Sequence, residues 1–166
     1  MADRAPPQGA PAQSAVVNTL APRDPAYAKR IARNFKAQAF MALLGAHLGR
    51  VAPGEVEIRL PLRPELSQQH GFAHAGAAWA IADSAAGFAA QSLMASEDGV
   101  LTVELKINLL APAAGTELVA YGKVERGGRR LTVGRSDVYA VAPDGQVHVA
   151  TALGTFMTMI GMEAAR

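Results

Sequence analysis

The second half of the chain alternates apolar and polar residues with a period of two, which is typical of half-buried β-strands. Four such segments follow one another, at residues 100–112, 116–126, 130–142 and 146–160. Gly127 and Gly128 separate the second segment from the third, and this pair predicts a two-residue hairpin turn. A further alternating segment, residues 55–63, comes earlier in the chain. The pattern therefore predicts five strands, four of them in direct succession.

Two other segments have the spacing of helices. The first starts at Asp24, a helix N-cap followed by Pro25, and is expected to run to about residue 47. Its polar face contains four basic residues, Lys29, Arg30, Arg33 and Lys36, and it is expected to end near Gly49 and Pro53-Gly54. The second segment, residues 75–95, is apolar on all sides and predicts a buried helix.

Successive strands after one buried helix indicate an antiparallel sheet wrapped around that helix, an α+β architecture. Residues 24–162 are expected to form this single domain, and the Ala- and Pro-rich residues 1–23 are expected to be a disordered leader. The composition agrees with a close wrapping of the sheet. The chain is 50% hydrophobic but only 5% aromatic, because alanine is abundant.

Composition also excludes several classes of protein. The chain has no cysteine, which excludes disulfides and thiolate metal sites. The four histidines, at positions 47, 70, 74 and 148, have no metal-ligand spacing, so neither a metal nor a cofactor is expected. A net charge of +2 without a basic run does not indicate a nucleic-acid partner. The apolar stretch 75–96 contains Asp83 and few leucines, so we predict no membrane span and a cytoplasmic protein.

Asp83 is the only Asp, Glu, Lys or Arg residue between Glu65 and Glu97. A carboxylate on a buried helix is unfavourable unless it is hydrogen-bonded or reaches a wet cleft, so a structural and a catalytic role are both open. His74, Ala75 and Gly76 stand at the start of the same helix, where free N–H groups can bind an oxyanion. Asp83 lies about 13 Å from His74 along the axis. Two antiparallel copies of the helix could bring both groups to one reacting centre.

The segment QQHGFAHAGAAWAIADSAAGFAA, followed by VLTVELKINLLAPAAG, resembles the hotdog-fold acyl-CoA thioesterases of the phenylacetate-degradation (PaaI-like) type. It is most similar to their medium- and long-chain acyl-CoA branch. The family pattern is His-Gly-Gly, an Asp nine positions after the His, a Ser or Thr on the next strand, and an Asn or Gln six positions before the His. Here these residues are His74-Ala75-Gly76, Asp83, Thr102 and Gln68.

The resemblance implies hydrolysis of acyl-CoA by a homodimer or homotetramer. Asp83 would be the general base or the nucleophile, and Ala75 or Gly76 of the other subunit would polarise the thioester carbonyl. Gln68 would add a donor to that oxygen or hold the water, and Thr102 would orient the water or the thiol. His74 would bind the leaving sulfur or fix the loop, an alternative that stays open. Ala75 replaces the usual middle glycine, and Gln68 the commoner asparagine.

Three arginines, Arg126, Arg129 and Arg130, flank the predicted hairpin turn and could bind the phosphates of coenzyme A, or could simply be solvated. Trp79 and Phe88 are interpreted as core residues rather than as lining of an acyl pocket, although a pocket role for Trp79 stays open. His70 is interpreted as structural. Two rival functions remain, a non-catalytic acyl-CoA-binding protein and a hotdog hydratase or dehydratase. The binding protein could lose Asp83, which is present here, and the loop pattern expected of the hydratase is not found. A third alternative, a structural subunit, would explain the buried helix but not Asp83 together with the His-Ala-Gly turn.

Overall fold

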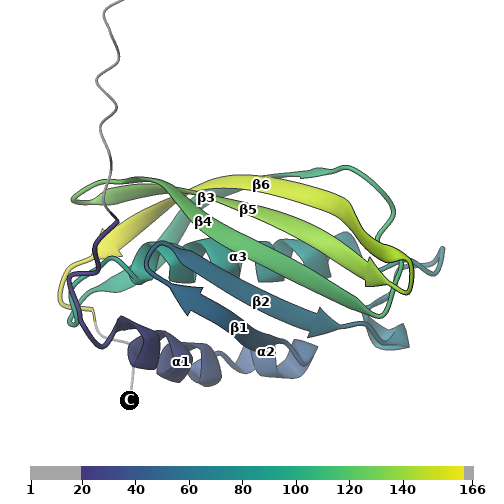
Figure 1. Ribbon diagram of the computed structural model, residues 1–166, viewed down its shortest axis with the longest axis horizontal. Helices are drawn as coiled ribbons and strands as arrows, with labels where there is room; N and C mark the ends of the chain where they lie inside the picture. The colour runs from purple at the N-terminus through teal and green to yellow at the C-terminus, as the bar shows by residue number, and fades with distance from the viewer. Residues whose placement is uncertain (1–19, 163–166) are drawn as a thin grey trace, which may run out of the picture.

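The computed structural model describes residues 20–162, which form one antiparallel sheet of six strands curved over a central helix (Figure 1). The strand order is β1-β2-β4-β5-β6-β3, so β1 and β3 are the two edges. The bounds are β1 His47–Ala52, β2 Glu55–Pro61, β3 Gly99–Leu109, β4 Glu117–Gly127, β5 Leu131–Ala142 and β6 Gly145–Met159. The helices are α1 Tyr27–Ala37, α2 Ala39–Leu44, the 3₁₀ turn η1 Pro64–Leu66, and α3 Ala75–Gln91. The predicted α+β architecture is confirmed.

The central helix α3 packs against the sheet, and most of its residues from Ala77 to Gln91 are buried, as its apolar sequence predicted. Its sheet-facing side consists of alanines, which let β4 approach closely. A Cβ atom added to Gly122 of β4 would lie 2.2 Å from the carbonyl carbon of Ala85, so only glycine fits at this crossing. The alanine-rich composition is therefore the consequence of tight contact between helix and sheet.

The first helical segment differs from its prediction in two ways. Asp24 accepts a hydrogen bond from Ala26 N–H at 2.8 Å, but regular helix starts only at Tyr27. The helix is then interrupted at Gln38, and α2 ends at Leu44, where Gly45 adopts a left-handed conformation with φ of 79°. The residues up to 47 are thus not one continuous helix.

The strand β1 was missed by the sequence analysis. Gly49 lies inside this strand, and Pro53-Gly54 form the hairpin turn to β2 rather than a helix end. The sequence HLGRVA does not predict a strand, because β1 is a half-exposed edge strand whose apolar and polar residues do not alternate regularly. The β4–β5 turn was also predicted too short, because residues 128–130 form a three-residue connection.

The leader was predicted to extend to residue 23. Residues 1–19 lie outside the described residues, but Leu20 packs against the core and Arg23 Nε donates to Leu93 O at 3.2 Å. The folded domain therefore includes at least residues 20–23. No helix in residues 20–162 is long and apolar enough to cross a membrane.

Candidate active site

The Asp83 side chain of α3 is in contact with the Thr102 side chain of the edge strand β3. The Thr102 hydroxyl donates a hydrogen bond to Asp83 Oδ1 at 2.8 Å. Burial raises the pKa of the Asp83 carboxyl above its ordinary value, and the hydrogen bond from Thr102 opposes this rise. No described cation forms an ion pair with Asp83. One carboxylate oxygen is thus fixed by Thr102, while the other has no hydrogen bond with a described residue.

A β-bulge directs Thr102 toward the helix. Thr102 pairs with Phe156 of β6, but Glu104 pairs with Thr155, so Val103 is an extra residue in β3. Phe156 is fully buried on the helix side of the sheet. The alternation of apolar and polar residues expected over residues 100–112 is therefore broken at Thr102. Only the bulge puts the hydroxyl on the same side as Asp83.

The N-terminus of α3 has one backbone donor left unused. His74 is the N-cap, and its ring Nδ1 accepts a hydrogen bond from Gly76 N–H at 2.9 Å. The next amide, Ala77 N–H, donates to the His74 carbonyl at 2.9 Å. Ala75 is exposed, and its N–H makes no hydrogen bond with a described residue. Of the two predicted amide donors, Gly76 is thus occupied and Ala75 is available.

Gln68 lies beside Ala75, in a tight turn between η1 and α3. Its side-chain oxygen accepts a hydrogen bond from His70 N–H, which leaves the side-chain NH₂ group as a donor. Both residues line a depression of about 380 Å³ that is otherwise mainly apolar. Its other walls include Phe72, Ala78, Leu109, Leu110 and Val149. Two donors therefore border an apolar hollow, an arrangement that suits a carbonyl attached to an apolar group.

Within one chain, the structure does not bring these two groups of residues together. Ala75 and Asp83 are eight residues apart on one helix, or about 12 Å along its axis. The three predicted phosphate-binding arginines lie elsewhere again. Arg129 lines a cavity together with Leu93 and Met94, just beyond the C-terminal end of α3. Arg130 is exposed in the same connection, and Arg126 is exposed near the end of β4.

The exposed stripe of α3 explains how the site could be completed. Gly76 and Trp79 lie on the same side of the helix as Asp83, and the Trp79 side chain is 41% exposed. The interpretation of Trp79 as a core residue is therefore wrong for the single chain, whereas Phe88 is buried against Phe35 as expected. The neighbouring edge strand β3 exposes Leu101, Val103 and Leu109. An apolar helix stripe beside an apolar sheet edge is a surface suited to a second copy of the chain.

The remaining histidines are placed apart from this site. His47 lies 3.8 Å from Glu117, and His148 lies 3.2 Å from Asp137 on the outer face of the sheet. Within residues 20–162, no three His, Asp or Glu side chains are grouped so that they could hold a metal ion. Three amide side chains that the sequence pattern did not single out line one cavity, namely those of Asn34, Gln38 and Gln91. Asn34 and Gln38 stand four residues apart on the apolar face of the first helical segment.

The six-stranded antiparallel sheet and the central helix define a hotdog fold. A family model described as the thioesterase superfamily matches residues 70–144. A thioesterase family protein from Silicibacter pomeroyi is 43% identical; the match covers 81% of this chain and 99% of that one, with a TM-score of 0.80. The chain therefore belongs to the thioesterase superfamily.

Two more solved structures are similar. A conserved protein from Pseudomonas aeruginosa is 30% identical, with 77% of this chain and 99% of that chain covered and a TM-score of 0.69. The PaaI protein of the phenylacetic acid degradation operon of E. coli is 19% identical and has a TM-score of 0.73, over 82% of this chain and 95% of its own. At this identity the likeness to PaaI shows a common fold.

Proposed function

We propose that the protein hydrolyses acyl-CoA thioesters to free acids and coenzyme A, as a homodimer acting in the cytoplasm. The observation that carries the proposal is the half-buried Asp83 carboxylate, which accepts a hydrogen bond from Thr102 and lies beside the exposed Trp79 on α3. A carboxylate with a raised pKa in such a place is suited to accept a proton. Family membership favours a thioester as its substrate.

A dimer would bring the Asp83 carboxylate and the free N–H group of Ala75 together, which a single chain does not do. If β3 pairs with β3 of a second copy around a two-fold axis, the two α3 helices become antiparallel neighbours. Asp83 of one subunit then faces the N-terminus of the partner's helix, and each dimer has two such sites. The pairing also covers Trp79 and the apolar edge of β3, which is a physical reason for the association.

The reaction would proceed by attack of water on the thioester carbonyl carbon. Asp83 accepts one proton from the water as the new C–O bond forms. The developing oxyanion is stabilised by the N–H of the partner's Ala75 and by the side-chain NH₂ of the partner's Gln68. When the tetrahedral intermediate collapses, the C–S bond breaks and the proton on Asp83 passes to the leaving thiolate. Direct attack by Asp83 through an acyl-anhydride is the alternative route.

The binding of coenzyme A is assigned to Arg126, Arg129 and Arg130. In the antiparallel dimer the C-terminal end of one α3 helix lies toward the N-terminal end of the other, so these arginines would border the partner's carbonyl site. Replacing Arg129 and Arg130 by alanine should raise KM for CoA esters far more than for a thioester truncated before the nucleotide. An equal rise for both would remove these residues from the coenzyme site.

The decisive experiment measures thiol release from short-, medium- and long-chain and aromatic acyl-CoAs by the wild type and by Asp83→Asn. The nearly isosteric substitution should lower kcat by about 10²- to 10⁴-fold, because it removes the proton acceptor but keeps the shape. Asp144→Asn, in an exposed turn, is the matched control and should be fully active. Full activity of Asp83→Asn would disprove the mechanism. Binding of acyl-CoA by an inactive wild type would instead indicate a non-catalytic binding protein. The panel also tests the expected medium- to long-chain preference.

A further inference from the structure

A second cavity, of about 320 Å³, lies between the first helical segment, α3 and the start of β3. It is distinct from the depression at Gln68. Its walls combine amide and apolar side chains, namely Asn34, Gln38, Phe88, Gln91, Val100 and Met162. Such a mixture is typical of pockets that orient a mostly apolar ligand with a few polar contacts.

This cavity lies one to two helical turns from the proposed reacting centre. Phe88 is five residues beyond Asp83 on α3, which is about 7.5 Å along the axis. Val100 precedes Thr102 by two residues on the same side of β3, about 6.6 Å away along the strand. An acyl group whose carbonyl lies at Asp83 would reach the cavity by extending past Thr102 toward Val100, which lines the cavity at the start of β3.

The amides in the cavity have unused hydrogen-bonding capacity. Asn34 is 9% exposed and its side-chain NH₂ donates to Gln91 Oε1 at 3.2 Å. The side-chain oxygens of Asn34 and Gln38 are buried, and neither accepts a hydrogen bond in the structure. Buried acceptors without a donor are destabilising, so these oxygens fit a ligand that brings a donor to them.

We propose that this cavity binds the far end of the acyl group, and that Asn34 and Gln38 select acyl chains whose far end carries a hydroxyl group. The inference rests on the proposed thioesterase function. A hydroxyl group both donates and accepts, so it can pair with an amide oxygen and with an amide NH₂ group. A carboxylate end, which only accepts, would face the two unpaired oxygens and is disfavoured. Phe88, Val100 and Met162 provide apolar contacts for the methylene chain.

The distance fixes the length of the chain that fits. A path of about 7 Å corresponds to about five or six carbon–carbon bonds, because an extended chain with bonds of about 1.5 Å advances only about 1.3 Å per bond. The matched probes are therefore hexanoyl-CoA and 6-hydroxyhexanoyl-CoA, which differ only in the terminal hydroxyl.

The test compares kcat/KM of the two esters by thiol release. The wild type should favour the hydroxylated ester by about tenfold, because a site with buried polar groups rejects a ligand that leaves them unpaired. In the double variant Asn34→Leu/Gln38→Met this ratio should fall to about one. Gln146→Met, an exposed position on β6, is the matched control and should keep the wild-type ratio. If the double variant does not fold, Gln38→Met alone should still reduce the ratio.

A binding measurement separates this inference from the proposed function. Both esters are titrated calorimetrically into Asp83→Asn, which can bind without turnover. Tighter binding of 6-hydroxyhexanoyl-CoA supports the pocket assignment, whereas equal affinities and equal kcat/KM values overturn it and leave the thioesterase function intact. If the wild type cleaves no ester of the panel, the proposed function fails, and the titration alone decides whether the cavity recognises the hydroxyl group.

Discussion

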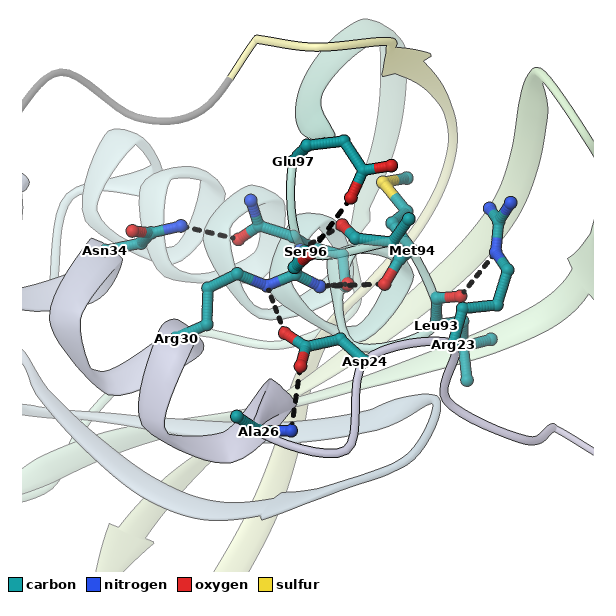
Figure 2. Close-up of polar contacts among 11 residues, drawn as sticks. Arg23, Asp24, Ala26, Arg30, Asn34, Leu93, Met94, Ser96 and Glu97 are labelled. Carbon is teal, nitrogen blue, oxygen red and sulfur yellow. Dashed lines mark hydrogen bonds and ion pairs between the residues drawn. The ribbon is translucent and has the colours of Figure 1, made fainter.

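The two ends of α3 differ in how far the rest of the domain covers them and satisfies their backbone groups. The C-terminal end is closed (Figure 2). The Arg30 guanidinium is 5% exposed and donates to the carbonyl oxygens of Gln91 and Met94, each at 2.9 Å, and to that of Ala95. Asp24 pairs with Arg30 Nε at 3.2 Å. One arginine thus satisfies three carbonyls at and just after the end of the helix.

The N-terminal end is open. Only the ring of His74 and the His74 carbonyl satisfy its first amides, and Ala75 and Gly76 remain exposed. The partial positive charge of a helix N-terminus is therefore accessible, while the partial negative charge of the C-terminus is neutralised by a buried cation. We infer that the closed end serves stability and the open end serves binding and catalysis. Substitutions at the two ends should therefore affect different measurements.

The largest effect on stability is expected from Arg30→Met. The substitution leaves three carbonyls and the Asp24 carboxylate unpaired in a buried place, which should lower the free energy of unfolding by about 3–5 kcal/mol. Denaturant unfolding measures this loss. Lys29→Met, on the exposed side of α1, is the control and should change it little. The folded fraction of Arg30→Met should keep the kcat of the wild type. A large fall in kcat would show that the C-terminal end of α3 also contributes to catalysis, and would contradict the division between the two ends.

At the open end, Ala75→Pro should reduce kcat by about 10²- to 10³-fold, because it removes the N–H donor to the oxyanion. Proline is well tolerated at the first position of a helix, and His74 already has the extended conformation, with ψ of 138°, that a residue before proline needs. The melting temperature should therefore remain near that of the wild type. Ala75→Gly keeps the N–H group and should remain active. A fully active, folded proline variant would exclude this amide from the reaction.

Thr102→Val should lower kcat/KM by about tenfold, since a hydrogen bond to a charged group contributes about 1.5–3 kcal/mol. The Thr102 hydroxyl lowers the pKa of Asp83, so its removal should move the acidic limb of the pH–rate profile to higher pH. The control is Thr155→Val, which lies on the outer side of the sheet. An unshifted acidic limb would show that Thr102 does not act through Asp83.

The smallest effect concerns stability against pH. Because burial raises the folded-state pKa of Asp83, this group favours folding most below its unfolded pKa, and that contribution is lost as the pH rises through the folded pKa. The wild type should therefore become less stable relative to Asp83→Asn as the pH increases over this range, whereas kcat/KM increases over the same range. Melting curves of both proteins from acidic to neutral pH measure the difference, and a constant difference would contradict the raised pKa.

The sequence located the central helix because its signals were local. An all-round apolar pattern predicted its burial, and the isolation of Asp83 in a long uncharged stretch identified the residue that needs a chemical explanation. The strands β2 to β6 could be predicted for the same reason, since each has its own alternation. The strand β1 could not, because it is an edge strand in which exposure on both faces removes the pattern.

Other features of the structure depend on contacts between segments that are distant in the sequence. Arg30 has the spacing of a solvated residue on a basic helix face, yet it is buried because the end of α3 offers it several carbonyls more than sixty residues away. Thr102 has the alternation of an outward-facing residue, and only the bulge opposite Phe156 turns it toward Asp83.

The sequence by itself thus determined the architecture, the buried alanine-rich helix and the identity of its lone carboxylate, because periodicity and charge are properties of neighbouring residues. The tertiary structure decided which amide at the start of α3 stays available, which face Thr102 presents, and where Asn34 and Gln38 are left without donors. These outcomes depend on which groups meet across the sheet and between helices, and such meetings are set by packing rather than by local pattern.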